Sequence, residues 1–107
     1  MTTMNQEALN NIIKSAESPV LVTYKAVWCR PCSMLKGVIE EVQSEKLADF
    51  ILLAIDADEN MDMAASAGVR GVPTSFLYSG GNLINTKVGA MNKKQLVDFI
   101  NTAKGAV

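Results

Sequence analysis

The sequence contains no histidine, only two cysteines and few aromatic residues among its 107 positions. Without histidine, a catalytic triad with an imidazole base and a zinc site with imidazole ligands are both excluded. Two cysteines cannot form the disulfide framework of a small secreted protein. Net charge is also close to zero, because ten basic residues balance eleven acidic ones to a formal value of −1. This balance gives no reason to expect nucleic acid or an anionic membrane as a partner.

Long apolar runs are missing as well. The longest, Phe50 to Ile55, is far shorter than the roughly 20 residues that a membrane-spanning helix needs. The first residues, Met1 to Glu7, lack the basic and apolar regions of a signal peptide. We therefore expect a cytoplasmic protein without a membrane partner. In that compartment two cysteines are more often reactive or metal-binding than structural.

The composition is that of an ordinary folded domain. Hydrophobic residues make up 49% and charged residues 20% of the chain, and a chain of 107 residues can bury a core without support from disulfides or metals. No linker, repeat or low-complexity stretch interrupts the sequence. We predict a single domain over residues 1–107, and we expect it to be a monomer.

Hydrophobic periodicity predicts the order of the secondary-structure elements. Helices are expected after Asn5, from Pro31, over 61–67 and over 93–103, and strands over 20–24, 50–55, 74–78 and 83–88. Asn5 and Asn92 are the predicted N-caps of the first and last helices, and Gln95 completes a capping box. Two apolar strands joined through a helix imply a parallel pair, whereas the last two strands form an antiparallel hairpin. The predicted fold class is α/β, with a mixed central sheet and helices on both faces.

Two of these elements carry specific expectations about burial. The helix from Pro31 has an apolar stripe that should face the core, made of Met34, Leu35, Val38, Ile39 and Val42. The strand over 50–55 is apolar almost throughout, which is typical of a strand covered on both faces. We therefore expect both the stripe and the strand to be buried.

The two cysteines stand in the segment Trp28-Cys29-Arg30-Pro31-Cys32, where the first apolar strand ends and the second helix begins. A cysteine at a helix N-terminus faces unpaired backbone N–H groups and the positive end of the helix dipole, which stabilise a thiolate. Cys32 follows one helical turn later, close enough to form a small disulfide. Pro31 suits the first turn because no intrahelical hydrogen bond is lost there. This placement favours a redox role for the pair.

Other roles for the cysteine pair compete with redox exchange. A tetrahedral zinc site or a rubredoxin-like iron site needs four ligands, and the chain has no further cysteine or histidine, so we predict no metal site. A metal bridged between two chains and a pair of buried, inert cysteines remain open as alternatives. The position of the pair at a strand-to-helix junction favours redox exchange over both.

Together with two later motifs, the cysteine segment resembles the thioredoxin family. The segment Arg70-Gly71-Val72-Pro73-Thr74 is similar to the family's cis-proline loop, and Lys87-Val88-Gly89-Ala90 is similar to its later glycine segment. The helix at Lys93 resembles the family's C-terminal helix. The resemblance runs nearly from end to end, and it implies a thioredoxin fold with a mixed central sheet of four to five strands flanked by helices on both faces.

The resemblance also implies a role for each site residue. Cys29 would be the attacking thiolate and Cys32 the resolving thiol, while Pro73 would be cis and lie against the disulfide. The residues that would bind the substrate are Trp28, Gly71, Val72, Pro73 and Gly89. Those that would support the active site are Trp28, Arg30, Pro31, Pro73 and Thr23.

The activity that the resemblance implies is the reduction of protein disulfides by dithiol–disulfide exchange. Oxidised protein would be recharged by a thioredoxin reductase, and no bound cofactor is needed. Two alternatives remain open. One is a glutaredoxin-like reductase recharged by glutathione, and the other is a binding subunit of a larger complex that uses this fold as a docking surface with little turnover.

The chain departs from the family pattern at five positions. Arg30 stands where the family usually has glycine, and Thr23 replaces a buried aspartate. The remaining departures are Leu52 for a lysine, Lys25 for a tryptophan and Gly37 for a helix-kinking proline. Because Thr23 cannot accept a proton from Cys32 as a carboxylate would, we expect resolution to depend on water or on direct thiolate capture and to be slower. An N-terminal strand would be short, with only Thr2-Thr3-Met4 available to it.

Charge is distributed unevenly along the chain. Residues 18–39 and 63–97 hold all three motifs and contain basic residues but no aspartate or glutamate. We expect an electropositive active face that favours acidic partners, the alternative being scattered lysines that merely solvate the surface. Arg30 beside the thiolate should stabilise the reduced form and make the couple more oxidising.

Overall fold

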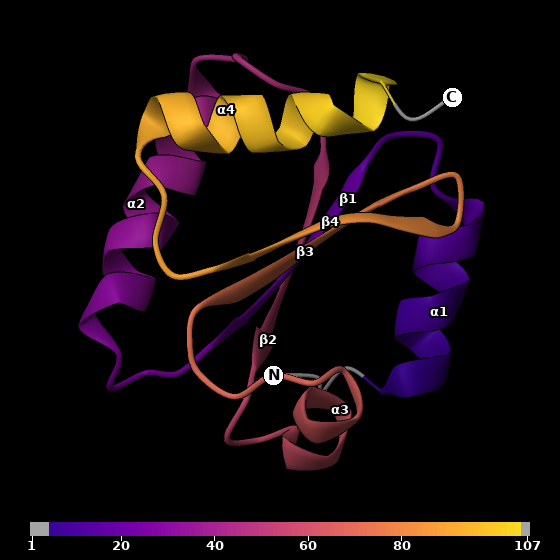
Figure 1. Cartoon of the computed structure of the whole chain (residues 1–107), viewed down its shortest axis with the longest axis vertical. Helices are drawn as coiled ribbons and strands as arrows, with labels where there is room; N and C mark the ends of the chain where they lie inside the picture. The colour runs from indigo at the N-terminus through magenta and orange to yellow at the C-terminus, as the bar shows by residue number, and fades with distance from the viewer. Residues whose placement is uncertain (1–4, 106–107) are drawn as a thin grey trace.

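A computed structural model describes residues 5–105, which form a mixed four-stranded sheet between two layers of helices (Figure 1). The elements in chain order are α1 (Gln6–Ser15), β1 (Val20–Lys25), α2 (Arg30–Ser44), β2 (Ile51–Asp56), α3 (Met61–Ser66), β3 (Thr74–Ser79), β4 (Asn82–Val88), α4 (Lys93–Asn101) and the short 3₁₀ helix η1 (Thr102–Gly105). This order and the α/β class confirm the prediction. The strand expected at Thr2-Thr3-Met4 lies outside the described residues.

The sheet has the strand order β2-β1-β3-β4. β1 runs parallel to β2 and antiparallel to β3, which pairs antiparallel with β4. The parallel pair and the hairpin are therefore both as predicted. At the hairpin turn Gly80 and Gly81 have φ values of 59° and 86°, a backbone region that glycine adopts without strain.

The predicted caps fix where two helices begin. The side chain of Asn5 accepts a hydrogen bond from the N–H of Ala8 at 2.7 Å, at the start of α1. At the start of α4, Asn92 accepts from the N–H of Gln95 at 2.8 Å, and the Gln95 side chain accepts from the N–H of Asn92 at 2.9 Å. These bonds satisfy backbone donors that a helix leaves unpaired in its first turn.

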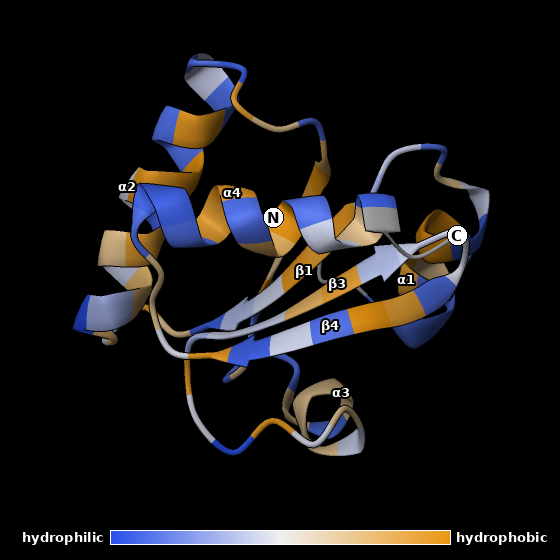
Figure 2. Cartoon of the chain, turned by 45° about the horizontal axis from the view of Figure 1, so that its top comes forward, coloured by the Kyte–Doolittle hydropathy of each residue, from blue (hydrophilic) through white to orange (hydrophobic). Residues whose placement is uncertain are grey.

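Each face of the sheet packs against its own pair of helices. Leu21 of β1 and Leu77 of β3 are fully buried against α2 and α4. On the other face, Val22 and Tyr24 of β1 are buried with residues of α1 and α3. Figure 2 shows hydrophilic and hydrophobic segments alternating along α4, as expected of a helix with one buried face. Because side chains alternate along β1, Thr23 lies on the same face as Leu21, toward α2.

Two burial predictions were wrong. β2 is an edge strand, and Ile55 is its one buried residue, while Ile51 and Ala54 are exposed. An edge strand has one neighbour, and the helix layer leaves part of this strand uncovered. In α2, Leu35, Ile39 and Val42 are buried as expected, but Met34 is 63% exposed. Met34 is turned roughly 100° around the helix from Leu35, which takes it out of the buried stripe.

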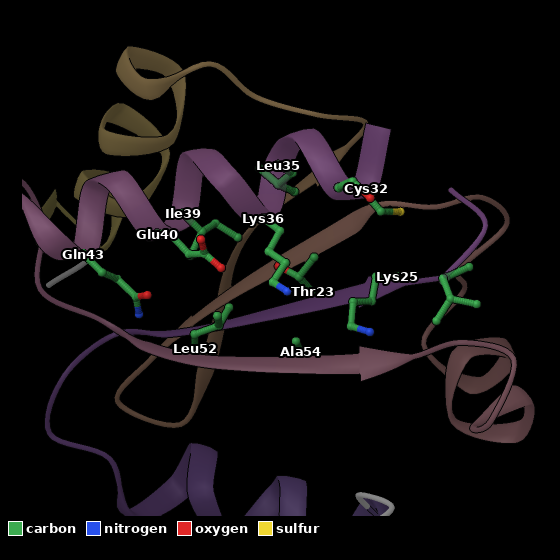
Figure 3. Close-up of a pocket in the computed structure, with 13 residues that line it drawn as sticks. Thr23, Lys25, Cys32, Leu35, Lys36, Ile39, Glu40, Gln43, Leu52 and Ala54 are labelled. Atoms are coloured by element: carbon green, nitrogen blue, oxygen red, sulfur yellow. The ribbon is translucent and has the colours of Figure 1, made fainter. Parts of the chain in front are cut away.

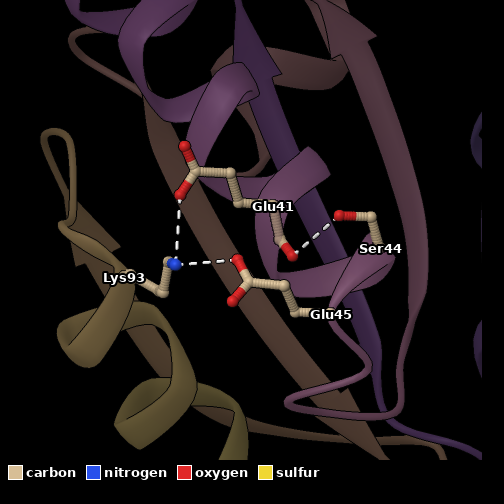
Figure 4. A network of polar contacts seen from close by, with 4 residues as sticks. All are labelled: Glu41, Ser44, Glu45 and Lys93. Atoms are coloured by element: carbon tan, nitrogen blue, oxygen red, sulfur yellow. Dashed lines mark hydrogen bonds and ion pairs between the residues drawn. The ribbon is translucent and has the colours of Figure 1, made fainter.

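An ion-pair network connects α4 to the C-terminal half of α2 (Figure 4). Nζ of Lys93 lies 2.7 Å from a carboxylate oxygen of Glu45 and 3.4 Å from one of Glu41. The hydroxyl of Ser44 donates to the backbone carbonyl of Glu41 at 3.2 Å. The hydrogen bond to Glu45 raises the pKa of Lys93 above its ordinary value. Because these side chains are exposed, the ion pairs contribute little to the free energy of unfolding.

Gly37 provides a test of the helix assignment. It lies in the middle of α2, and a Cβ added there meets nothing within 4 Å. We predict that Gly37→Ala raises the free energy of unfolding by about 0.5–1 kcal/mol, because alanine loses less backbone entropy in a helix. The measurement is urea denaturation of the oxidised protein.

Gly68→Ala is the matched control for this substitution. Gly68 follows α3 with a φ of 81°, which an alanine adopts only with strain. We expect it to lower stability by about 1 kcal/mol. A destabilising Gly37→Ala would contradict the account of α2 as an unstrained helix at that position.

Candidate active site

The two cysteines form a disulfide at the start of α2. Their Cα atoms are 5.2 Å apart, and both residues are buried. Cys29 is the N-cap of α2, and its Sγ accepts a hydrogen bond from the backbone N–H of Cys32 at 3.2 Å. The sulfur therefore satisfies a donor that the helix leaves unpaired, the position usually taken by a serine or aspartate oxygen.

The electrostatic surroundings of this sulfur are positive. The first turn of α2 contains no acidic residue, and Arg30 occupies its first position with an exposed side chain. The helix dipole adds a partial positive charge at the same end. An arginine at this end of a helix is repelled by the positive end of the dipole, so Arg30 lowers the stability of α2 slightly.

The loop before β3 lies against the disulfide. The Val72–Pro73 peptide bond is cis, as predicted, and Pro73 is fully buried. The carbonyl oxygen of Val72 is 3.6 Å from Cys29 Sγ. The carbonyl of Pro73 accepts a hydrogen bond from the N–H of Gly89 at 2.8 Å, and the carbonyl of Gly71 accepts one from the Thr74 hydroxyl at 2.6 Å. The three sequence motifs therefore meet at one site.

Trp28 is held by a residue that the sequence analysis missed. Its side chain is 70% exposed, and the indole N–H donates to a carboxylate oxygen of Asp58 at 2.8 Å. Asp58 stands in the loop after β2, whose backbone N–H groups at Asp58 and Glu59 donate to Asp56. Because β1 and β2 are parallel neighbours, the loops that follow them lie at the same edge of the sheet. That rule could have located Asp58 near Trp28.

Thr23 occupies the buried position on β1 that the sequence comparison singled out. It is 5% exposed and lies between Ala54 of β2 and Ser75 of β3 in the sheet register. Its hydroxyl is 3.2 Å from the hydroxyl of Ser75, which is fully buried. The two side chains satisfy each other, and neither is a carboxylate that could serve as a base. Ser75 was also missed, because nothing in the sequence indicates the register of β1 and β3.

A cavity of about 400 Å³ opens between α2 and β2 behind the disulfide (Figure 3). Cys32 and Thr23 both line it, so the resolving position predicted from the sequence borders this space. Its polar lining also includes four residues to which the sequence analysis gave no role in the site: Lys25, Lys36, Glu40 and Gln43. Cys32, Lys36, Glu40 and Gln43 follow one another along α2 at spacings of four, four and three residues, which places them on one face of the helix and could have indicated the last three.

A disulfide that caps a helix, next to a cis-proline loop on a mixed sheet, defines a class of protein: thiol–disulfide oxidoreductases with the thioredoxin fold. The family model described as Thioredoxin matches residues 1–102. The chain belongs to the thioredoxin family, and it is a thiol–disulfide oxidoreductase.

Individual relatives agree with this assignment. The chain is 42% identical over 89 residues to a thioredoxin of Pseudomonas aeruginosa, covering 83% of this chain and 82% of the relative. It is 33% identical over 98 residues to a thioredoxin of Haemophilus influenzae, covering 92% of each. Its structure is similar to that of a mutant thioredoxin from Halobacterium salinarum, with a TM-score of 0.83, 34% identity and coverage of 94% of this chain and 87% of that one.

The Thr23–Ser75 contact generates a prediction about stability. Thr23→Val keeps the shape of the side chain but leaves the buried Ser75 hydroxyl without its partner, which should cost about 1–3 kcal/mol. Adding Ser75→Ala removes the stranded hydroxyl. We therefore predict that the double variant loses less stability than the sum of the two single variants, by about 1 kcal/mol, in urea denaturation. Additive losses would show that the two hydroxyls do not depend on each other.

Proposed function

We propose that this thiol–disulfide oxidoreductase reduces disulfides in partner proteins, with Cys29 as the nucleophile and Cys32 as the resolving thiol. The observation that carries this assignment is the backbone N–H of Cys32 directed at Cys29 Sγ, 3.2 Å away, at the N-terminus of α2. In the reduced protein the same donor, the helix dipole and Arg30 favour the thiolate of Cys29. Cys32 lies inside the first turn of α2 and has no comparable cap.

The first step is attack by the Cys29 thiolate on one sulfur of the substrate disulfide. A bond forms between Cys29 and that sulfur, the substrate S–S bond breaks, and the second substrate sulfur leaves as a thiolate. In the second step the sulfur of Cys32 attacks Cys29, which forms the Cys29–Cys32 disulfide and releases the other substrate thiolate. Two electrons pass from the protein dithiol to the substrate.

The proton of Cys32 must leave before or during the second step. Thr23 is a hydroxyl paired with Ser75, so it does not take this proton as a carboxylate would. We propose that a departing substrate thiolate captures it, directly or through water in the adjoining cavity. Resolution is then slower than in a relative with a carboxylate at this position.

Substrate recognition is proposed at the surface around the disulfide. Gly71 is exposed and Val72 is half-buried, so their backbone groups are accessible to an extended substrate segment. The hydrogen bond from the N–H of Gly89 to the carbonyl of Pro73 holds Gly89 beside them. Pro31 restricts the backbone between the two cysteines, and Pro73 restricts the backbone of the loop that lies against Cys29. Trp28 adds an exposed apolar surface. The positive charge of Arg30 favours substrates with acidic residues near their disulfide. The nearby carboxylate of Asp58 accepts a hydrogen bond from the indole N–H of Trp28 instead of pairing with Arg30.

We propose that a thioredoxin reductase supplies the electrons that regenerate the dithiol, and that the chain acts as a monomer of one domain over residues 1–107 without a cofactor. No helix within residues 5–105 is long and apolar enough to span a membrane.

Serine variants of the cysteines test the division of roles. We predict that Cys29→Ser abolishes the reduction of insulin disulfides by the protein with thioredoxin reductase and NADPH. Cys32→Ser should instead accumulate a mixed disulfide between Cys29 and the substrate, because attack proceeds without resolution. Mass spectrometry identifies the cysteine that carries the adduct. An adduct formed through Cys32 in the Cys29→Ser variant, and none on Cys29, would reverse the roles.

The same assay separates the alternative functions. A glutaredoxin-like protein would work with reduced glutathione as the electron donor and not with thioredoxin reductase. A binding subunit would keep its function in the Cys29→Ser, Cys32→Ser double variant and would show little turnover in the wild type. Turnover with the reductase, lost in the double variant, is the result that our proposal predicts.

The charge of Arg30 yields a separate prediction about redox equilibrium. Without this cation the Cys29 thiolate is less stable, so Arg30→Gly and Arg30→Gln should both make the couple more reducing. We expect a shift of about 30 mV, a tenfold change in the equilibrium constant with glutathione. Lys14→Gln, a charge removal on α1, is the control and should leave the potential unchanged. No shift in either Arg30 variant, or a shift toward a more oxidising potential, contradicts this role.

A further inference from the structure

Three of the five positions at which the chain departs from the family pattern share one location. Thr23, Lys25 and Leu52 all line the cavity of about 400 Å³ between α2 and β2 (Figure 3). The proposed redox chemistry uses only the end of this cavity that Cys32 borders. The mechanism proposed above assigns no function to the two lysines that line it, Lys25 and Lys36, or to its apolar walls.

This cavity, called the groove from here on, has apolar walls. On one side the face of α2 that includes Ile39 lines it, and on the other side lie Leu52 and Ala54 of β2. Ala54 is exposed although its strand is paired with β1, because no side chain of the helix layer covers it. A volume of about 400 Å³ falls within the range of small-molecule sites, roughly 300–1,000 Å³. The groove is therefore large enough for a ligand with a short hydrocarbon body.

Positive charge gathers at one part of this groove. Lys25 from β1 and Lys36 from α2 both line it, and Figure 3 shows their side chains extending into the same space near Thr23. Among residues 5–105 the ion pairs involve Lys93 and Lys94, so neither groove lysine has an acidic partner within that range. Asp56 is beside Lys25 in the sheet register, but its carboxylate accepts hydrogen bonds from the N–H groups of the following loop.

The acidic lining residue stands apart from this cationic part. Glu40 lies one turn beyond Lys36 along α2, and Gln43 follows it toward the far end of the groove. Figure 3 shows Glu40 on the side of Lys36 that faces away from Cys32. The groove thus has a cationic part next to Cys32 and Thr23, and apolar walls that run from there toward Gln43.

We propose that this groove binds a small amphipathic monocarboxylate, a short- or medium-chain acid. The carboxylate lies between the ammonium groups of Lys25 and Lys36, with the hydroxyl of Thr23 beside it. The hydrocarbon chain lies between Ile39 and Leu52. Two cations without acidic partners match one carboxylate, and the apolar walls match a chain that leaves water on binding.

Octanoate is the probe for this site. Calorimetric or NMR titration of the oxidised wild-type protein should show saturable binding at millimolar concentrations or below, weakened by added salt. Octanol, with the same chain and no charge, should bind more weakly. Because the titration uses the oxidised protein without turnover, its outcome is independent of whether the proposed disulfide reduction is correct.

Variants locate the binding within the groove. Lys25→Gln and Lys36→Gln should each weaken octanoate binding about three- to tenfold through loss of one cation. Ala54→Leu should abolish binding, because the larger side chain projects from an exposed strand position into the groove. Lys14→Gln, on the helix layer that covers the opposite face of the sheet, should bind as the wild type does.

Two results would overturn the proposal. One is the absence of saturable octanoate binding to the wild-type protein. The other is binding that Ala54→Leu and both groove lysine variants leave unchanged, which would place the ligand elsewhere. Circular dichroism and thermal unfolding of each variant establish that a loss of binding does not come from a loss of fold.

Discussion

The hydrogen bond from the backbone N–H of Cys32 to Cys29 Sγ is the contact on which the site depends. It makes one sulfur the N-cap of α2 and leaves the other inside the first helical turn, so two chemically identical side chains receive different surroundings. β1 ends just before Cys29, so the strand places this residue at the start of α2. Pro31 suits the first turn of α2 because no backbone hydrogen bond is lost there. The carbonyl oxygen of Val72, 43 residues later in the sequence, lies 3.6 Å from Cys29 Sγ.

The rest of the fold holds this arrangement in place. β1 and β3 are the central strands, and they carry Cys29 at one end and the cis-proline loop at the same edge. The hydrogen bond between Gly89 and Pro73 connects the end of β4 to that loop. Arg30 shows where function overrides local preference, since a cation is repelled by the positive end of the helix dipole but adds to the positive potential that stabilises the Cys29 thiolate. Thr23, Lys25 and Leu52 line a groove beside this site.

Sequence reasoning located most of the elements and the central chemistry, because both depend on local signals. Asn5 and Asn92 are caps by residue type, and Cys29 stands at a strand-to-helix junction that periodicity reveals. The failures concern what tertiary packing decides. Whether β2 is a central or an edge strand depends on the strand order, which the sequence does not show. The exposure of Ala54, which lines the groove, depends on the same strand order. The pairing of Thr23 with Ser75 needs the strand register, and the contact of Trp28 with Asp58 joins two loops that are 30 residues apart.

The central claim is that the N-terminus of α2 makes Cys29, and not Cys32, the reactive thiolate. Alkylation of the fully reduced protein with iodoacetamide at neutral pH, followed by peptide mass spectrometry over time, tests it most directly. The account predicts that Cys29 is modified first, at a rate about ten times that of Cys32 or more, because alkylation follows the thiolate fraction. Equal rates at the two cysteines, or faster modification of Cys32, would contradict it.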